Sequence, residues 1–315
     1  MKIVVLGAGA LGCALGSVLT EGGHEVWLIN RGQDHVDAMC QRGLKVREEG
    51  VDRYVIVHAA TSCLDVDLTS GAVDLIIVLV KSFHTLEAIE SAKSILTNDT
   101  VVLSLQNGLG HEEILAKAVG QKHVLAGKTY AGGVLIGFGH IILGTKGKET
   151  HIGELTGEVT LRVTQIADVF NQAGLQTIVS QNILGTMWDK LMVNVATGAL
   201  SGITRLSYGE LYKLSEVQDC AIAAVTEAMS VAVAKGVKLS VTDPMQPWIK
   251  AAVGLPNEFK ASMLQSLEKG SITEIDFVNG AVVYWGTQLG VPTPVNKTLV
   301  ACMKGIERGL FQTSN

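Results

Sequence analysis

The 315-residue sequence is poor in charged and aromatic side chains, which make up 17% and 5% of it. Its net charge is −5, and its 25 lysines and arginines are scattered instead of gathered in one run. A surface that follows nucleic-acid phosphates needs clustered positive charge, so we expect no nucleic-acid partner. The hydrophobic fraction of 47% excludes a disordered chain and predicts an ample core.

Cysteines are also few, and none forms a CxxC pair. Five widely spaced cysteines argue against a disulfide framework or a zinc knuckle, and they favour a reducing, cytoplasmic compartment. The eight histidines show no HxxxH pair or other chelating cluster, so we expect no metal.

Long hydrophobic runs are absent as well. The apolar run at residues 75–80 ends at Lys81, well short of the roughly 18 to 20 residues of a membrane-spanning helix. Residues 1–20 carry a lysine followed by an apolar run, as a weak signal peptide does. Their glycines at 7, 9, 12 and 16 favour a loop over a continuous apolar helix. We therefore expect no membrane partner.

Short apolar runs rich in β-branched residues alternate with helical patterns in the first half of the sequence. This alternation is typical of βαβ units around a parallel sheet. Between residues 132 and 152, short glycine-punctuated strands predict antiparallel hairpins that extend the sheet. A helix and a strand then close this half. The predicted strands are residues 3–6, 26–29, 75–80, 101–105 and 175–179, and the predicted helices are 10–21, 34–41, 85–94, 111–118 and 158–172.

After residue 180 no strand pattern appears, and residues rich in Ala, Leu, Val and Met continue at helical spacing. All five prolines fall in this half, where they mark loops between helices. At roughly 150 residues per domain, the length supports about two domains. We predict an α/β domain over residues 1–181 and an all-α helical domain over residues 182–315.

A glycine-rich turn directly follows the first predicted strand and opens the first predicted helix. This context is the one that a dinucleotide-binding fingerprint requires. The first glycine allows the tight turn, the second lets the pyrophosphate approach the backbone, and the third lets helix pack on strand. The predicted cofactor-binding residues are Gly7, Ala8, Gly9, Ala10, Leu11 and Gly12.

Asn30 and Arg31 follow the second predicted strand, where an acidic residue would bind the ribose of an unphosphorylated cofactor. An arginine can instead hold a 2′-phosphate by a charge-assisted fork, so the sequence favours NADPH/NADP over NAD. The alternative is that Arg31 is a solvated loop charge.

Lys81 and Asn107 each follow a predicted strand, at the edge of the sheet where ligands bind in such folds. A lysine after an apolar strand is often only solubilising, and Asn-Gly is a common turn. Further on, Lys190 and Asn194 lie four apart, hence on one helix face, although a lysine there ordinarily reaches to solvent. Glu274 ends the sequence Ser271-Ile272-Thr273-Glu274, which fits a helix capping box without any catalysis.

Taken together, these motifs resemble the ketopantoate reductase (2-dehydropantoate 2-reductase) family over nearly the whole chain. The matching motifs, in order, are GAGALG at residues 7–12, Lys81, QNGLG at 106–110, WxKLxxN at 188–194, SMLQ at 262–265, TEID at 273–276 and Asn279-Gly280. The resemblance implies a Rossmann-type domain followed by a helical domain, with NADPH and a 2-keto acid bound between them. It also implies reduction of 2-dehydropantoate to pantoate in pantothenate biosynthesis.

The resemblance further implies a role for each matching residue. Lys190 is the expected general acid and Glu274 its partner, while Asn194 and Ser262 hold substrate. Lys81 and Asn107 line the nicotinamide and substrate end. Reducing a ketone needs a proton for the developing alkoxide, and a buried ammonium can supply it.

Three positions depart from the family pattern: Gly198 stands where an asparagine is common, and Ser266 and Ser271 replace an aspartate and an arginine. These changes leave open a different 2-keto acid as substrate. A non-catalytic NADPH-binding regulator would be expected to lack Lys190 or Glu274, and both are present. His84 or His111 remains an alternative acid, and a homodimer is possible.

Overall fold

The computed structural model describes residues 1–312 and divides into two compact units. The first unit comprises residues 1–106 and 111–183, and the second comprises residues 107–110 and the described residues from 184 onwards. The short loop 107–110 is thus embedded in the sequence of the first unit but packs with the second.

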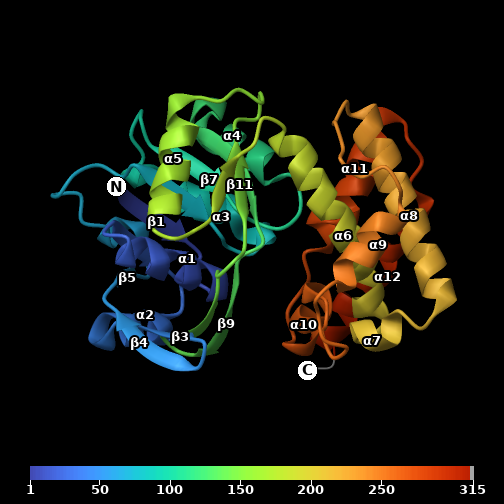
Figure 1. The fold of residues 1–315 in the computed structure, drawn as a ribbon, viewed down its shortest axis with the longest axis horizontal. Helices are drawn as coiled ribbons and strands as arrows, with labels where there is room; N and C mark the ends of the chain where they lie inside the picture. The colour runs from blue at the N-terminus through green and yellow to red at the C-terminus, as the bar shows by residue number, and fades with distance from the viewer. Residues whose placement is uncertain (313–315) are drawn as a thin grey trace. The chain divides into compact units, whose positions relative to one another are not determined.

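The first unit is built on an eight-stranded sheet with β1 (Lys2–Leu6) in its interior (Figure 1). The strand order is β12-β11-β8-β7-β6-β1-β2-β5, and the strands from β8 to β5 run parallel. The remaining bounds are β2 (Glu25–Ile29), β5 (His58–Ala60), β6 (Leu75–Val78), β7 (Val101–Ser104), β8 (Val124–Thr129), β11 (Thr150–Gly153) and β12 (Thr177–Val179). This sheet confirms the predicted α/β class.

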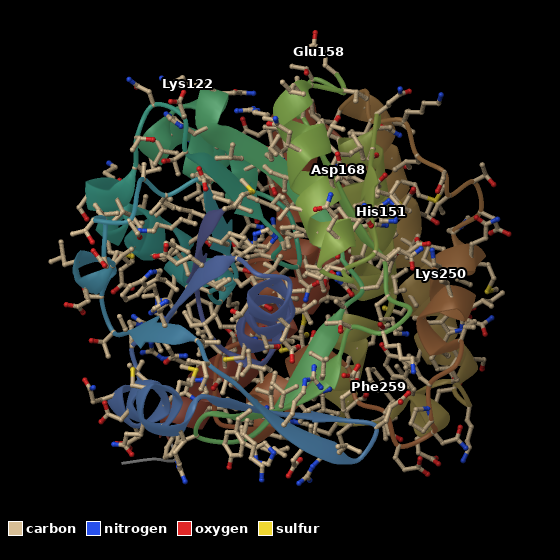
Figure 2. The ribbon with its side chains drawn as sticks, turned by 60° about the vertical axis from the view of Figure 1, so that its left-hand side comes forward. Lys122, His151, Glu158, Asp168, Lys250 and Phe259 are labelled. Carbon is tan, nitrogen blue, oxygen red and sulfur yellow. The ribbon has the colours of Figure 1, made fainter. Side chains whose placement is uncertain are left out.

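Helices cover both faces of the sheet because its central strands are apolar on both sides. Every residue of β1 and β6 is buried. One core forms with α1 (Ala10–Glu21) and α5 (Leu161–Gln172), and the other with α3 (Thr85–Ser91) and α4 (His111–Val119). Figure 2 labels Asp168 on α5 and His151 on β11, two elements that pack against each other.

A second sheet of four strands, in the order β4-β3-β10-β9, lies within the same unit. Its strands are β3 (Leu44–Glu48), β4 (Val51–Val55), β9 (Gly132–Gly137) and β10 (His140–Gly144), and α2 (Gln33–Arg42) precedes β3. The expectation that residues 132–152 extend the main sheet is therefore wrong for β9 and β10. Only β11 joins that sheet, antiparallel to β8, because β10 pairs in parallel with β3 instead.

The second unit is helical, and no strand occurs in its described part. This confirms the predicted all-α region. A buried polar network joins three of its helices: Asn296 accepts from Asn279 at 3.0 Å and donates to Glu227 at 2.8 Å. The helices are α6 (Ile183–Thr204), α7 (Tyr208–Leu211), α8 (Ser215–Ala234), α9 (Met245–Ala252), α10 (Ser262–Glu268), the short 3₁₀ helix η5 (Ile275–Phe277), α11 (Asn279–Leu289) and α12 (Pro294–Gln312).

Helix α8 corrects one expectation, since by length and composition alone it is apolar enough to cross a membrane. In the structure it packs against α9, α11 and α12. Its Glu227 accepts hydrogen bonds from the backbone nitrogens of Val295 and Asn296 at 2.8 and 2.9 Å. These contacts tie α8 into the helical unit, where 33% of its 18-residue apolar stretch is buried.

Candidate active site

The three fingerprint glycines occupy different environments: Gly7 and Gly9 lie in the loop between β1 and α1, and Gly12 lies in the first turn of α1. Gly7 has a φ of +101°, and a Cβ atom there would lie 2.5 Å from the backbone nitrogen of Val80. A Cβ atom on Gly12 would lie 2.2 Å from the carbonyl oxygen of Gly7. At Gly9 a Cβ atom would meet none of the described atoms within 4 Å. The fold itself requires Gly7 and Gly12, whereas Gly9 leaves space for a ligand to approach the backbone.

Helix α1 begins at Ala10, so Ala10 and Leu11 form its first turn. The first backbone N–H groups of a helix have no partner inside the helix, and the helix dipole favours an anion beside them. Gly9, the N-cap, provides no side chain that would take their place. The loop therefore fits the pyrophosphate of a dinucleotide.

Asn30 supports this loop from the end of β2. Its side-chain nitrogen donates to the Ala8 carbonyl at 2.8 Å, and its side-chain oxygen accepts from the Gly32 backbone at 2.8 Å. Both ends of the amide are thus engaged in backbone contacts, which indicates that Asn30 shapes the loop.

Arg31 is exposed and forms an ion pair with Glu87, with a nitrogen–oxygen distance of 3.1 Å. The same carboxylate lies 3.1 Å from Nδ1 of His84. Exposed pairs of this kind contribute little to stability, so Arg31 can exchange its partner at small cost. A phosphate near Arg31 would meet Glu87 as a competing anion.

Lys81 is exposed and precedes a 3₁₀ turn over Ser82–His84, while β6 ends at Val78, two residues earlier than predicted. Gln106 ties this region to the loop after β7. Its side-chain nitrogen donates to the Val80 carbonyl and to the Thr85 hydroxyl, both at 2.8 Å. The sequence motif contained Gln106, but its link to the loop after β6 required the fold.

The loop 107–110 contacts η5 of the helical unit. The backbone nitrogen of Leu109 donates to the Phe277 carbonyl at 2.9 Å. Gly108 has a φ of +99°, and a Cβ atom there would lie 2.5 Å from the same oxygen. Asn107 is exposed at the start of this loop. The contact brings Asn107 to the segment that carries Glu274, a proximity that the sequence did not reveal.

Helix α6 carries Lys190 and Asn194 one turn apart, both half-buried. The residue before Lys190 is anchored: Asp189 accepts from the backbone nitrogen and the hydroxyl of Ser240 at 3.1 and 2.5 Å. Trp188, with 1% of its surface exposed, fixes the opposite side of this turn in the core. The turn that presents Lys190 is therefore held by both polar and apolar contacts.

Ser262 begins α10, and its neighbour Met263 packs on α6. A Cβ atom on Gly198 would lie 3.3 Å from Cε of Met263. The glycine thus allows α10 to approach the turn after Asn194. An asparagine at position 198 would require the flexible Met263 side chain to shift.

Glu274 is half-buried and caps η5 without a side-chain hydrogen bond to it. The predicted capping box is wrong, because no helix begins within residues 271–274. The Ser271 backbone nitrogen instead donates to the Ser266 carbonyl at 2.9 Å, closing the turn after α10. No capping box between Ser271 and Glu274 therefore competes with the catalytic interpretation of Glu274.

The two alternative acids occupy different environments. His84 is 35% exposed beside Glu87, whereas His111 is fully buried at the start of α4. Within residues 1–312, no group of three or more His, Cys, Asp or Glu side chains is placed to hold a metal ion.

Two family models match this chain. "Ketopantoate reductase PanE/ApbA" matches residues 3–157, and "Ketopantoate reductase PanE/ApbA C terminal" matches residues 182–307. A 2-dehydropantoate 2-reductase of Pyrococcus horikoshii is 35% identical over 307 residues, which cover 98% of each chain. A counterpart from Archaeoglobus fulgidus is 32% identical and covers 98% of this chain and 99% of its own.

Solved structures resemble the whole chain as well. A ketopantoate reductase of Ralstonia eutropha is 34% identical with a TM-score of 0.88, covering 98% of this chain and 99% of its own. A D-mandelate dehydrogenase with NADH and anilino(oxo)acetate is 29% identical with a TM-score of 0.89, at the same coverage. A nicotinamide dinucleotide is thus the cofactor class of this group. Because both halves match the family models and the relatives match at full length, the chain belongs to the ketopantoate reductase family.

Proposed function

We propose that this protein reduces 2-dehydropantoate to pantoate with NADPH, as a cytoplasmic step of pantothenate biosynthesis. The observation that carries the proposal is the glycine geometry of the β1–α1 loop, where Gly9 alone opens onto space. The full-length relatives named 2-dehydropantoate 2-reductase support the substrate. The proposal also includes a homodimer.

Reduction of the ketone requires a hydride at the carbonyl carbon and a proton at the carbonyl oxygen. A bound reduced nicotinamide supplies the hydride. Lys190 donates the proton to the oxygen as negative charge develops there, and Glu274 keeps the ammonium charged before transfer. The lysine is recharged from solvent, so one proton is consumed in each reduction.

The remaining site residues bind and orient. Asn194, one turn from Lys190 on α6, and Ser262 on α10 hold the substrate by hydrogen bonds. Asn107 lies on the loop that contacts η5, and it serves substrate and nicotinamide. Lys81 and Arg31 serve the cofactor, with Arg31 selecting the 2′-phosphate.

A second candidate is a reductase of a bulkier 2-keto acid. Gly198 favours it, because this position lacks the asparagine common in the family and its Cβ direction faces the flexible Met263 side chain. The similar D-mandelate dehydrogenase was solved with an aromatic oxoacetate, anilino(oxo)acetate. That relative was solved with NADH, so this candidate would also relax the preference for NADPH.

Steady-state rates with 2-dehydropantoate, benzoylformate and short aliphatic 2-keto acids distinguish the candidates, each measured with NADPH and NADH. The proposal expects the highest kcat/KM for 2-dehydropantoate with NADPH. If the Met263 side chain shifts to admit it, Gly198→Asn should restore a hydrogen bond to 2-dehydropantoate and lower its KM. The kcat should not change, because a contact of equal strength in the ground state and the transition state does not alter it. A tenfold higher kcat/KM for another 2-keto acid would contradict the proposed substrate but not the proposed reduction of a 2-keto acid.

A further inference from the structure

His35 is a buried histidine of α2, with 4% of its surface exposed, and it carried no expected role. Both of its ring nitrogens contact backbone. Nδ1 lies 3.0 Å from the backbone nitrogen of Gly139, in the turn between β9 and β10. Nε2 lies 3.0 Å from the carbonyl oxygen of Ala8, in the fingerprint loop.

These two partners determine the tautomer of the ring. The Gly139 N–H can only donate, so Nδ1 must present its lone pair. The Ala8 carbonyl can only accept, so Nε2 must carry the proton. Burial lowers the pKa of His35, which keeps the ring in this neutral form. A protonated ring would place two donors against each other at Gly139.

Three side chains meet at the Ala8 carbonyl: one from α2, one from α1 and one from the residue that follows β2. His35 on α2 reaches it together with Asn30 at 2.8 Å and with Sγ of Cys13, on α1, at 3.4 Å. Burial raises the pKa of the Cys13 thiol to about 12, so it stays protonated and donates. Because a peptide unit is planar, holding the Ala8 carbonyl also sets the orientation of Gly9.

We propose that His35, as the Nε2–H tautomer, is a positioning residue that orients the Ala8–Gly9 peptide of the pyrophosphate loop and ties that loop to the β9–β10 turn. This inference rests on the proposed dinucleotide binding at residues 7–12. It adds to that function a buried residue that affects the affinity for the cofactor indirectly, through the loop.

Two substitutions of the same residue separate its two contacts. In His35→Gln the amide nitrogen can take the place of Nε2 and donate to Ala8. In His35→Asn the amide oxygen can take the place of Nδ1 and accept from Gly139, while the Ala8 contact is lost. Cofactor dissociation constants are measured for both variants by quenching of intrinsic fluorescence with NADPH and with NADH.

We expect His35→Asn to weaken dinucleotide binding about three- to tenfold, the range of one lost neutral hydrogen bond. His35→Gln should bind within about twofold of the unmodified protein. The matched control is His123→Asn, since His123 is also buried in the first unit and its Nδ1 contacts the Thr100 carbonyl at 2.8 Å, away from the loop. This control should keep its dinucleotide affinity.

Equal affinity losses in His35→Asn, His35→Gln and His123→Asn would overturn the proposal, because general destabilisation would then explain them. Unchanged affinity in His35→Asn would overturn it too. A chain that binds no dinucleotide even when unmodified contradicts the proposed function instead.

The unmodified protein offers a second test that needs no variant. Nitrogen-15 NMR of the ligand-free protein should show His35 with its proton on Nε2 at neutral pH. A proton on Nδ1, or a charged ring, would overturn the proposal.

Discussion

Glu307 on α12 accepts two hydrogen bonds from Thr273, one from its backbone nitrogen at 2.7 Å and one from its hydroxyl at 2.6 Å. Both residues are buried, and Thr273 directly precedes Glu274. A second contact reinforces the first, because Lys304 lies 3.3 Å from Glu307 and also pairs with Asp276. The segment that presents Glu274 is thus bound on both sides to α12.

Glu307→Ala should therefore destabilise the protein and lower kcat. It leaves the Thr273 N–H buried without a partner, which costs about 1 to 3 kcal/mol. Glu307→Gln keeps an acceptor and should lose less in both measures. Denaturant unfolding and steady-state kinetics check this, with Glu268→Ala, from an exposed pair with Lys260, as the control. Equal behaviour of Glu307→Ala and Glu268→Ala would contradict the prediction.

Replacing Lys190 with Ala should lower kcat by about 10² to 10⁴, the usual contribution of a positioned acid. The dinucleotide Kd should remain unchanged, because the fingerprint loop lies in the other unit. Lys213→Ala is the control, since Lys213 is exposed on the helical unit and forms an ion pair with Glu210, three residues earlier. Near-normal turnover of Lys190→Ala would direct attention to His84 and His111.

Gly9→Ala should lose dinucleotide affinity, whereas Gly12→Ala should lose stability. At Gly9 the added methyl group meets no described atom within 4 Å, so stability should hold while dinucleotide affinity falls at least about tenfold, or about 1.4 kcal/mol. At Gly12 it would meet the Gly7 oxygen at 2.2 Å, so the fold should lose about 1 to 3 kcal/mol. Thermal unfolding and cofactor titration measure both. An unchanged Kd in Gly9→Ala would rule out the predicted pyrophosphate approach.

Arg31→Ala should weaken NADPH binding about ten- to a hundredfold and leave NADH nearly unaffected, as expected for one charge-assisted contact. Glu87→Gln should act in the opposite direction, because it removes the anion that now holds Arg31. Titration of both variants with both cofactors checks the pair. Parallel losses for NADPH and NADH would mean that Arg31 does not recognise the 2′-phosphate.

The buried carboxyl of Glu112 on α4 should make the stability of the protein depend on pH. Burial raises the pKa of its carboxyl from 4.5 to about 8, with the neighbouring Glu113 adding to the rise. Its Oε1 has no hydrogen-bond partner among the described residues. Between these values the folded chain keeps a proton that the unfolded chain releases. The contribution of Glu112 to the free energy of unfolding should therefore be greatest below pH 4.5. It should fall as the pH rises towards 8, by up to about 1.4 kcal/mol per pH unit.

Glu112→Gln should flatten this slope, whereas Glu113→Gln, an exposed neighbour on the same turn, should not. Denaturant unfolding at several pH values between 5 and 8 measures the difference. The buried His111 is retained in both variants, so any contribution from it cancels. Identical slopes in Glu112→Gln and the unmodified protein would contradict the prediction.

Local patterns determined much of the first unit. The apolar run at residues 3–6 of β1, the apolar run of β6 and the glycines at residues 7, 9 and 12 could be read directly. A buried strand and a tight turn each impose a residue-by-residue requirement. The strands β3 and β4 were not predicted, because they carry several charged residues and no apolar run. Strand β3 pairs with β10 across about 95 residues of sequence, and no local pattern can indicate so distant a partner.

The sequence by itself determined the α/β and helical halves, the fingerprint loop and the order of the family motifs. Only the tertiary structure decided that Leu109 bonds to Phe277, that Arg31 pairs with Glu87, and that His35 holds the Ala8 carbonyl. The physical reason is that periodicity and turn chemistry act between near neighbours in the chain. A hydrogen bond or ion pair across 27 to 168 residues exists only after the fold has brought its partners together.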